Sequence, residues 1–189
     1  CNNTHVHKQE TIMKEGVKIP HVVFKTRVRD ESIGGDNPFR WQDKSTVEYF
    51  KGNRVVVFSL PGAFTPTCST MQVPEYEQNY ENILKMDVEE VYCISVNDAF
   101  VMRKWGIDQN VQNCKLIGDG SGEFTRGMGM LVDKPAQGFG QRSWRYAMVV
   151  NDSVVEWFGE EPGRNNDSAD DDPYGVTSPE TILKYLQSV

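Results

Sequence analysis

The stretch of sequence that decides the fold reads Phe58-Ser59-Leu60-Pro61-Gly62-Ala63-Phe64-Thr65-Pro66-Thr67-Cys68-Ser69-Thr70. It begins as an apolar strand, turns through a segment rich in proline and glycine, and continues with helix character. This order places Cys68 at the start of a helix, where unpaired backbone N–H groups and the positive end of the helix dipole favour a thiolate. The sequence therefore predicts that Cys68 is a nucleophile. The hydroxyl of Thr65 is expected to form a hydrogen bond near the sulfur.

The remaining cysteines and the histidines limit what other chemistry the chain can perform. No histidine follows His21, so the body of the chain offers neither a Cys–His pair nor a histidine metal site. The cysteines are too scattered for a disulfide framework or a zinc site, and a reducing compartment such as the cytoplasm fits them. No glycine-rich nucleotide fingerprint occurs, so we expect no metal and no bound cofactor. The four cysteines are Cys1, Cys68, Cys93 and Cys114.

The composition predicts one globular domain that binds neither nucleic acid nor a membrane. The chain has 189 residues, of which 38% are hydrophobic, and its formal net charge of −7 does not attract phosphate backbones or anionic lipids. No apolar run approaches the ~20 residues that a membrane span needs. Residues 1–12 are polar and are interpreted as a flexible arm or a cloning remnant, which leaves residues 13–189 as the domain. A lipid anchor on Cys1 and an organelle location stay open as alternatives.

Short apolar runs alternate with helix signals along this domain, which is typical of an α/β fold with a central sheet flanked by helices. Strands are predicted at Val22–Phe24, Val55–Leu60, Val91–Val96, Cys114–Ile117 and Tyr146–Val150. Helices are predicted at Thr46–Lys51 behind a Ser45–Glu48 capping box, at Ala99–Trp105 between Asp98 and Gly106, and at Thr181–Gln187 behind Ser178.

Two features follow the last predicted strand. Val154–Phe158 comes after a short run of turn residues, which predicts a β-hairpin with Tyr146–Val150. Gly159–Asp172 is rich in aspartate, and we interpret it as a solvated surface loop that takes no part in chemistry.

The opening stretch also carries a family resemblance. Pro61, Thr65 and Cys68 match the Pro-x-x-x-Thr-x-x-Cys signature of the peroxiredoxins, and the string Pro-Gly-Ala-Phe-Thr-Pro-Thr-Cys-Ser resembles the version found in the five-type branch. The similarity extends to Cys93–Asp98, Gly122–Leu131 and Arg142–Tyr146, and thus covers most of Lys18–Val189. The chain is also similar to the peroxiredoxin half of hybrid peroxiredoxin–glutaredoxin proteins. The resemblance implies a thioredoxin-like fold with a central mixed β-sheet.

The resemblance also implies roles for four residues. Cys68 is the peroxidatic cysteine, Thr65 its hydrogen-bonding neighbour, Pro61 the residue that shields the pocket, and Arg145 the active-site arginine. A guanidinium beside the sulfur stabilises a thiolate and polarises a peroxide oxygen. Arg142 competes for this role, and a surface ion pair is the alternative for either arginine. The implied activity is a thiol-dependent peroxidase that reduces hydrogen peroxide and organic hydroperoxides.

The remaining cysteines bear on the mechanism. Cys93 lies inside an apolar strand and is expected to be a core residue, while Cys114 stays open as a disulfide partner of Cys68. Two-cysteine members of the branch carry a resolving cysteine near the C-terminus, but Asp172–Val189 contains none. This departure favours a one-cysteine mechanism in which glutathione, glutaredoxin or thioredoxin supplies the reducing thiol. The resemblance further suggests a homodimer that packs near the active-site edge.

Two other functions were weighed against the peroxidase. A disulfide oxidoreductase on the same fold needs Cys-x-x-Cys, and this chain has Thr65 in place of the first cysteine. A peroxide sensor or a holdase-type interaction protein would keep the fold without turnover. The presence of Thr65, Cys68 and Arg145 together favours the enzyme.

Overall fold

A computed structural model of the chain describes residues 14–166 and 172–189. The expected N-terminal arm, with Cys1, lies outside the described residues, and so do Asp167, Asp170 and Asp171 of the acidic loop. Within the described ranges, no helix is both long enough and apolar enough to cross a membrane.

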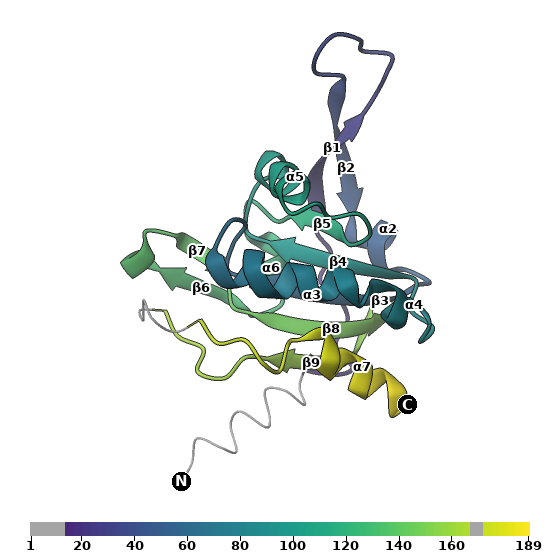
Figure 1. The fold of residues 1–189 in the computed structure, drawn as a ribbon, viewed down its shortest axis with the longest axis vertical. Helices are drawn as coiled ribbons and strands as arrows, with labels where there is room; N and C mark the ends of the chain where they lie inside the picture. The colour runs from purple at the N-terminus through teal and green to yellow at the C-terminus, as the bar shows by residue number, and fades with distance from the viewer. Residues whose placement is uncertain (1–13, 167–171) are drawn as a thin grey trace.

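Five strands form the central sheet in the order β5-β4-β3-β8-β9 (Figure 1). β3 runs parallel to β4, and β4 parallel to β5, whereas β8 pairs antiparallel with both β3 and β9. The sheet is therefore mixed, as predicted. The bounds are β3 Arg54–Leu60, β4 Glu90–Ser95, β5 Lys115–Gly118, β8 Tyr146–Asn151 and β9 Val154–Glu160. β8 and β9 form the predicted hairpin, which turns through Asp152 and Ser153, both at positive φ.

β3 lies at the centre of the sheet because its apolar run is buried on both faces. Val55 and Val57 belong to one core cluster, whereas Val56, Phe58 and Leu60 belong to the other. The first cluster contains side chains of α2 (Thr46–Phe50) and α6 (Glu123–Gly127). The second contains side chains of α3 (Val73–Gln78), α4 (Tyr80–Leu84), α5 (Ala99–Asp108) and α7 (Pro179–Gln187). The helices thus cover the sheet on both sides, as expected.

The three predicted helix starts are confirmed by their caps. The amide of Ser45 donates to Oε2 of Glu48 over 2.7 Å, which is one half of the capping box. Oδ1 of Asp98 accepts from the amide of Val101 over 2.9 Å. Oγ of Ser178 accepts from the amide of Thr181 over 3.4 Å.

The predicted end of the helix at Gly106 is wrong, because α5 continues through this residue to Asp108. A Cβ at position 106 would lie 3.0 Å from Cδ1 of Leu116 on β5. The glycine therefore permits a close approach between helix and strand, and it does not stop the helix.

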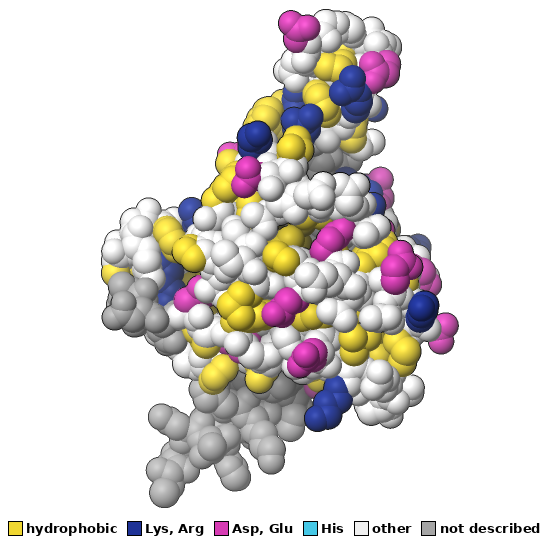
Figure 2. Space-filling model, viewed as in Figure 1, with side chains coloured by type: hydrophobic (Ala, Val, Ile, Leu, Met, Phe, Trp, Pro, Cys, Tyr) yellow, Lys and Arg dark blue, Asp and Glu magenta, His cyan; other side chains and the backbone are white. Residues whose placement is uncertain are grey.

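Two further hairpins were not predicted. β1 (Val23–Arg29) pairs with β2 (Phe39–Ser45), and β6 (Leu131–Lys134) pairs with β7 (Gly140–Ser143). Phe24 is the one buried residue in β1 and β2, so the rest of that hairpin has no apolar pattern to detect. Figure 2 shows basic side chains gathered on this projecting hairpin, with acidic side chains at its tip and scattered over the body below it.

Candidate active site

Cys68 lies in the first turn of the helical segment that follows β3. The turn Cys68–Gln72 is wound as a π-helix, and the amide of Val73 donates to the carbonyl of Cys68. Such wide turns are rare and often mark functional sites. The sulfur-bearing residue has no exposed surface. The predicted position of Cys68 at a helix start is therefore confirmed, and the thiol is enclosed.

Arg145 lies between β7 and β8 and is 1% exposed. Its Nη1 donates to Sγ of Cys68 over 3.4 Å and also to Oε1 of Gln72. Its Nη2 forms an ion pair with Asp172, and its Nε donates to the carbonyl of Pro173 over 3.2 Å. Burial by itself lowers the pKa of Arg145, but the neighbouring Cys68 and then Asp172 outweigh burial and raise that pKa. The guanidinium thus stays charged beside the sulfur.

Gln72 and Asp172 were missed by the sequence analysis. Gln72 stands four residues after Cys68 on the same helical segment, and this spacing could have indicated that the two share a face. Its side chain is fully buried, and its Nε2 has no hydrogen-bond partner among the described residues. Asp172 carried no local signal, because only the fold brings it to Arg145.

The loop Gly159–Asp172 was interpreted as a solvated surface loop, but Glu161 is buried, and the exposed Asp172 contacts the site. Asp172 pairs with Arg145, and Glu161 is 2% exposed. The Glu161 carboxylate accepts hydrogen bonds from the amides of Gly175 and Val176 and from the amide and hydroxyl of Thr177. A carboxylate with four donors is stable when buried, and it fixes the segment that follows Asp172.

The loop from Pro61 to Thr65 forms one side of the site. The hydroxyl of Thr65 donates to the carbonyl of Gly62 over 2.7 Å, and no hydrogen bond joins Thr65 to Cys68 in the described part of the chain. The hydroxyl keeps its lone pairs for an incoming donor. Phe64 has φ +66° and is 50% exposed, a strained conformation for an aromatic residue. Asn97 supports this conformation, since its Oδ1 accepts from the amide of Ala63 over 3.0 Å.

Arg142, the competing arginine, contacts the same loop, and among the described residues none of its hydrogen bonds goes to the sulfur of Cys68. Its Nη1 donates to the carbonyl of Pro61 over 3.1 Å. A Cβ at position 62 would lie 2.2 Å from that nitrogen, so Gly62 leaves the space that Arg142 occupies. The structure therefore brings Arg145 to Cys68 and places Arg142 against the backbone of the loop.

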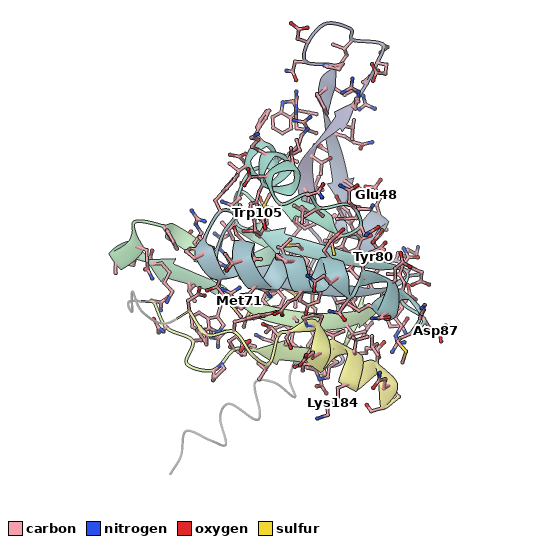
Figure 3. All side chains as sticks on the ribbon, viewed as in Figure 1. Glu48, Met71, Tyr80, Asp87, Trp105 and Lys184 are labelled. Atoms are coloured by element: carbon pink, nitrogen blue, oxygen red, sulfur yellow. The ribbon has the colours of Figure 1, made fainter. Side chains whose placement is uncertain are left out.

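A pocket of about 200 Å³ opens beside this loop and is mostly apolar. It is lined by Pro61, Thr65, Pro66, Lys134, Gln137, Phe139, Trp144 and Asp172. Three of the four predicted site residues, Pro61, Thr65 and Cys68, come from the one loop and turn. Arg145 joins them from the residue before β8, the strand that pairs with β3. The residue after Cys68 is held by α5, because Nε1 of Trp105 donates to Oγ of Ser69 over 3.0 Å (Figure 3).

Neither Cys93 nor Cys114 is bonded to another cysteine, and both are buried. Burial raises the pKa of both thiols, and at Cys114 the carboxylate of Glu77 raises it further. Cys93 is thus the expected core residue. In the described ranges, no group of three or more histidine, cysteine, aspartate or glutamate side chains could hold a metal ion.

Comparison with known proteins agrees with this fold. The Redoxin family model matches residues 37–172. A peroxiredoxin of Rhizobium etli is 59% identical over 171 residues, which cover 90% of this chain and 95% of that protein. The hybrid peroxiredoxin hyPrx5 of Haemophilus influenzae is 46% identical over 91% of this chain and 66% of its own length. The crystal structure of a Plasmodium falciparum antioxidant protein, described as a 1-Cys peroxiredoxin, superposes with a TM-score of 0.84 at 32% identity and covers 93% of this chain and 100% of that one.

The family match and the five-stranded mixed sheet define a thioredoxin-like redox protein. Within that class the chain belongs to the peroxiredoxins, in the five-type branch. Peroxiredoxins are thiol-dependent peroxidases, and the chain is accordingly an oxidoreductase that acts on peroxides.

Proposed function

We propose that the chain reduces hydrogen peroxide and organic hydroperoxides by a one-cysteine mechanism. The observation that supports this most directly is the 3.4 Å contact between Nη1 of Arg145 and Sγ of Cys68 in an enclosed site. Cys68 as thiolate attacks the terminal peroxide oxygen, the O–O bond breaks, and the departing alkoxide takes a proton to give the alcohol. Cys68 is left as a sulfenic acid, with sulfur oxidised and the peroxide reduced.

Arg145, Thr65 and Pro61 support this step in different ways. The guanidinium of Arg145 offers donors to the negative charge that develops on the peroxide oxygens, in a site where burial strengthens electrostatic interactions. The hydroxyl of Thr65, whose proton is donated to Gly62, accepts a hydrogen bond from the bound peroxide and orients it. Pro61 forms an apolar wall of the pocket and keeps water from the sulfur.

The sulfenic acid is then reduced by an outside thiol. A first thiol displaces water to form a mixed disulfide with Cys68, and a second thiol releases the reduced enzyme and a disulfide. Cys93 and Cys114 are poor candidates for resolution because they are buried with raised pKa values. The segment 172–189 contains no cysteine. Glutathione, glutaredoxin and thioredoxin are the proposed donors, on the resemblance to hybrid peroxiredoxins.

The decisive experiment treats the protein with peroxide in the absence of reductant and traps the product with dimedone. We expect a dimedone adduct on Cys68 and, with excess peroxide, irreversible sulfinic acid at the same residue. Peroxidase activity should survive when Cys1, Cys93 and Cys114 are all changed to serine. A Cys68–Cys114 disulfide that forms at the rate of turnover, together with loss of recycling in Cys114→Ser, would rule out the one-cysteine mechanism.

We further propose that the enzyme is a homodimer that packs near the active-site edge. Phe64 and Met71 flank the site and are 50% and 46% exposed, which leaves apolar surface for a partner to cover. Analytical ultracentrifugation of wild type and of Phe64→Ser tests this, and we expect a dimer that the substitution weakens. A monomer at all concentrations would contradict it. We also propose that residues 13–189 form one domain and that the protein is located in the cytoplasm.

A further inference from the structure

Lys134, the last residue of β6, is a buried cation that the peroxidase mechanism does not use. It is 4% exposed. Its Nζ donates to Oδ1 of Asn165 over 2.9 Å and lies 5.1 Å from the centre of the Trp144 ring. No carboxylate of residues 14–166 or 172–189 forms an ion pair with it. Lysine is almost never buried without a charged partner, because a neutral amide and a ring compensate only part of its lost hydration.

This lysine lines the pocket beside the active-site loop. Thr65 and Asp172 line the same pocket, and Asp172 pairs with Arg145, whose Nη1 contacts Cys68. The charge of Asp172 is already opposed by Arg145, so among the described residues that line the pocket Lys134 is the charge without a counter-charge. The remaining lining is chiefly hydrocarbon and aromatic, from Pro61, Pro66, Phe139 and Trp144. A volume of about 200 Å³ is smaller than a typical ligand pocket and has room for one end of a substrate only.

We propose that Lys134 makes this pocket a subsite for the carboxylate of a small substrate whose aliphatic part lies against the apolar walls. The inference rests on the proposed peroxidase function and names a substrate class for it. Two substrates of a one-cysteine enzyme can supply such a carboxylate, the organic hydroperoxide and the reducing thiol. The apolar lining fits the hydroperoxide better, and the experiment below separates the two.

The first arm compares two hydroperoxides that share one carbon skeleton, one with a free carboxylate and one with that carboxylate neutralised as a methyl ester. The acid is tert-butyl hydroperoxide in which one methyl group carries a carboxymethyl substituent. The ester is the methyl ester of that acid. The measured quantity is the ratio of their rate constants with reduced enzyme. In Lys134→Met this ratio, acid over ester, should fall about tenfold, as expected for loss of one charge-assisted hydrogen bond.

The second arm compares glutathione with its diethyl ester as reductants of the Cys68 sulfenic acid, with rates expressed per thiolate. If the carboxylate belongs to the thiol, Lys134→Met lowers the ratio of glutathione to diester and leaves the hydroperoxide ratio unchanged. A fall in either ratio supports the subsite, and the arm in which it falls identifies the substrate. Lys134→Arg should keep the ratio within about threefold of wild type, because it retains the charge.

Lys184→Met is the matched control, since it removes the same charge from an exposed position on α7, away from the pocket (Figure 3). It should leave both ratios unchanged. Lys134→Gln serves as a second variant if the methionine variant fails to fold by circular dichroism. Equal ratios in wild type and Lys134 variants in both arms would overturn the subsite. If wild type instead cannot be reduced by any monothiol, the one-cysteine proposal itself fails, which is a separate result.

Discussion

Cys68 and Cys114 are both buried in the core cluster on the same face of the sheet, yet their nearest charges have opposite signs. The sulfur of Cys68 meets the guanidinium of Arg145 at 3.4 Å. Cys114 instead lies at Glu77, whose Oε2 accepts from its backbone amide over 3.0 Å. Burial raises the pKa of Cys114 first, and the Glu77 carboxylate adds to the effect. The comparison teaches that two buried thiols on one face of a sheet can meet opposite charges, and a nearby cation favours a thiolate whereas a nearby carboxylate disfavours it.

The largest effect is expected from removing the nucleophile. Cys68→Ser should lower peroxide consumption by about a thousandfold or more, because serine at neutral pH is a far weaker nucleophile without a base beside it. Steady-state consumption with a thiol donor measures this. Cys114→Ser is the matched control, and near-normal activity is expected there. If the two variants lost activity equally, Cys68 could not be distinguished from Cys114 as the nucleophile.

The charge beside Cys68 should have the next largest effect. Arg145→Lys keeps a positive charge but loses the planar set of donors that contacts the sulfur, Gln72 and Asp172 together. We expect the second-order rate constant for peroxide to fall about a hundredfold, the usual effect of losing a transition-state donor. Arg142→Lys, at the arginine that contacts the Pro61 carbonyl, should cost about threefold at most. A reversal of these two results would transfer the role to Arg142.

A smaller effect is expected from removing the charge beside Cys114. Glu77→Gln should bring the pKa of Cys114 down toward its ordinary value, and a lower thiol pKa means more thiolate at a given pH. Alkylation of Cys114 by iodoacetamide at mildly alkaline pH should therefore be about tenfold faster, which corresponds to one pKa unit. Mass spectrometry of the Cys68→Ser background measures Cys114 without interference. An unchanged rate would mean that burial, and not Glu77, controls this thiol.

The central part of the fold was predictable because its pattern is local. The run Val55–Leu60 is apolar at every position except Ser59, which is what a strand buried on both faces requires. The hairpin of β1 and β2 was not predictable on the same basis, because contacts across its strands hold it together. Lys25 pairs with Asp43 over 2.9 Å, and the guanidinium carbon of Arg27 lies 4.9 Å from the Trp41 ring. Such pairs become visible only once the register is known.

The candidate site also has a part that local sequence spacing predicts and a part that depends on long-range contacts. Pro61, Thr65 and Cys68 lie within eight residues of one another, so their spacing alone indicated a shared loop and turn. Arg145 was identified by resemblance and not by local pattern. The pairing of Asp172 with Arg145 was missed, because an aspartate among aspartates indicates a solvated surface and only the fold brings this exposed residue to a buried arginine. Long-range pairing of charges is thus the part of the site that the sequence did not reveal.

Substitution of Cys93 should have the smallest effect on activity. It tests whether a cysteine buried in the core matters for stability alone. It is fully buried on β4, where burial raises the pKa of its thiol. Cys93→Ser places a hydroxyl in apolar surroundings, which costs about 1–3 kcal/mol when the hydroxyl finds no partner. For a chain of this length the melting temperature should fall by roughly 2–4 °C for each kcal/mol.

Cys93→Ala is the matched control for that substitution, because it removes the sulfur without adding a polar group. Thermal unfolding followed by circular dichroism should therefore place Cys93→Ser below Cys93→Ala, while the peroxidase rate constants of both folded variants stay within about twofold of wild type. A serine variant as stable as the alanine variant would show that the position tolerates a polar group. A large loss of activity in the folded alanine variant would mean that Cys93 takes part in the chemistry, and the assignment of reactivity to Cys68 by its neighbouring charge would then be incomplete.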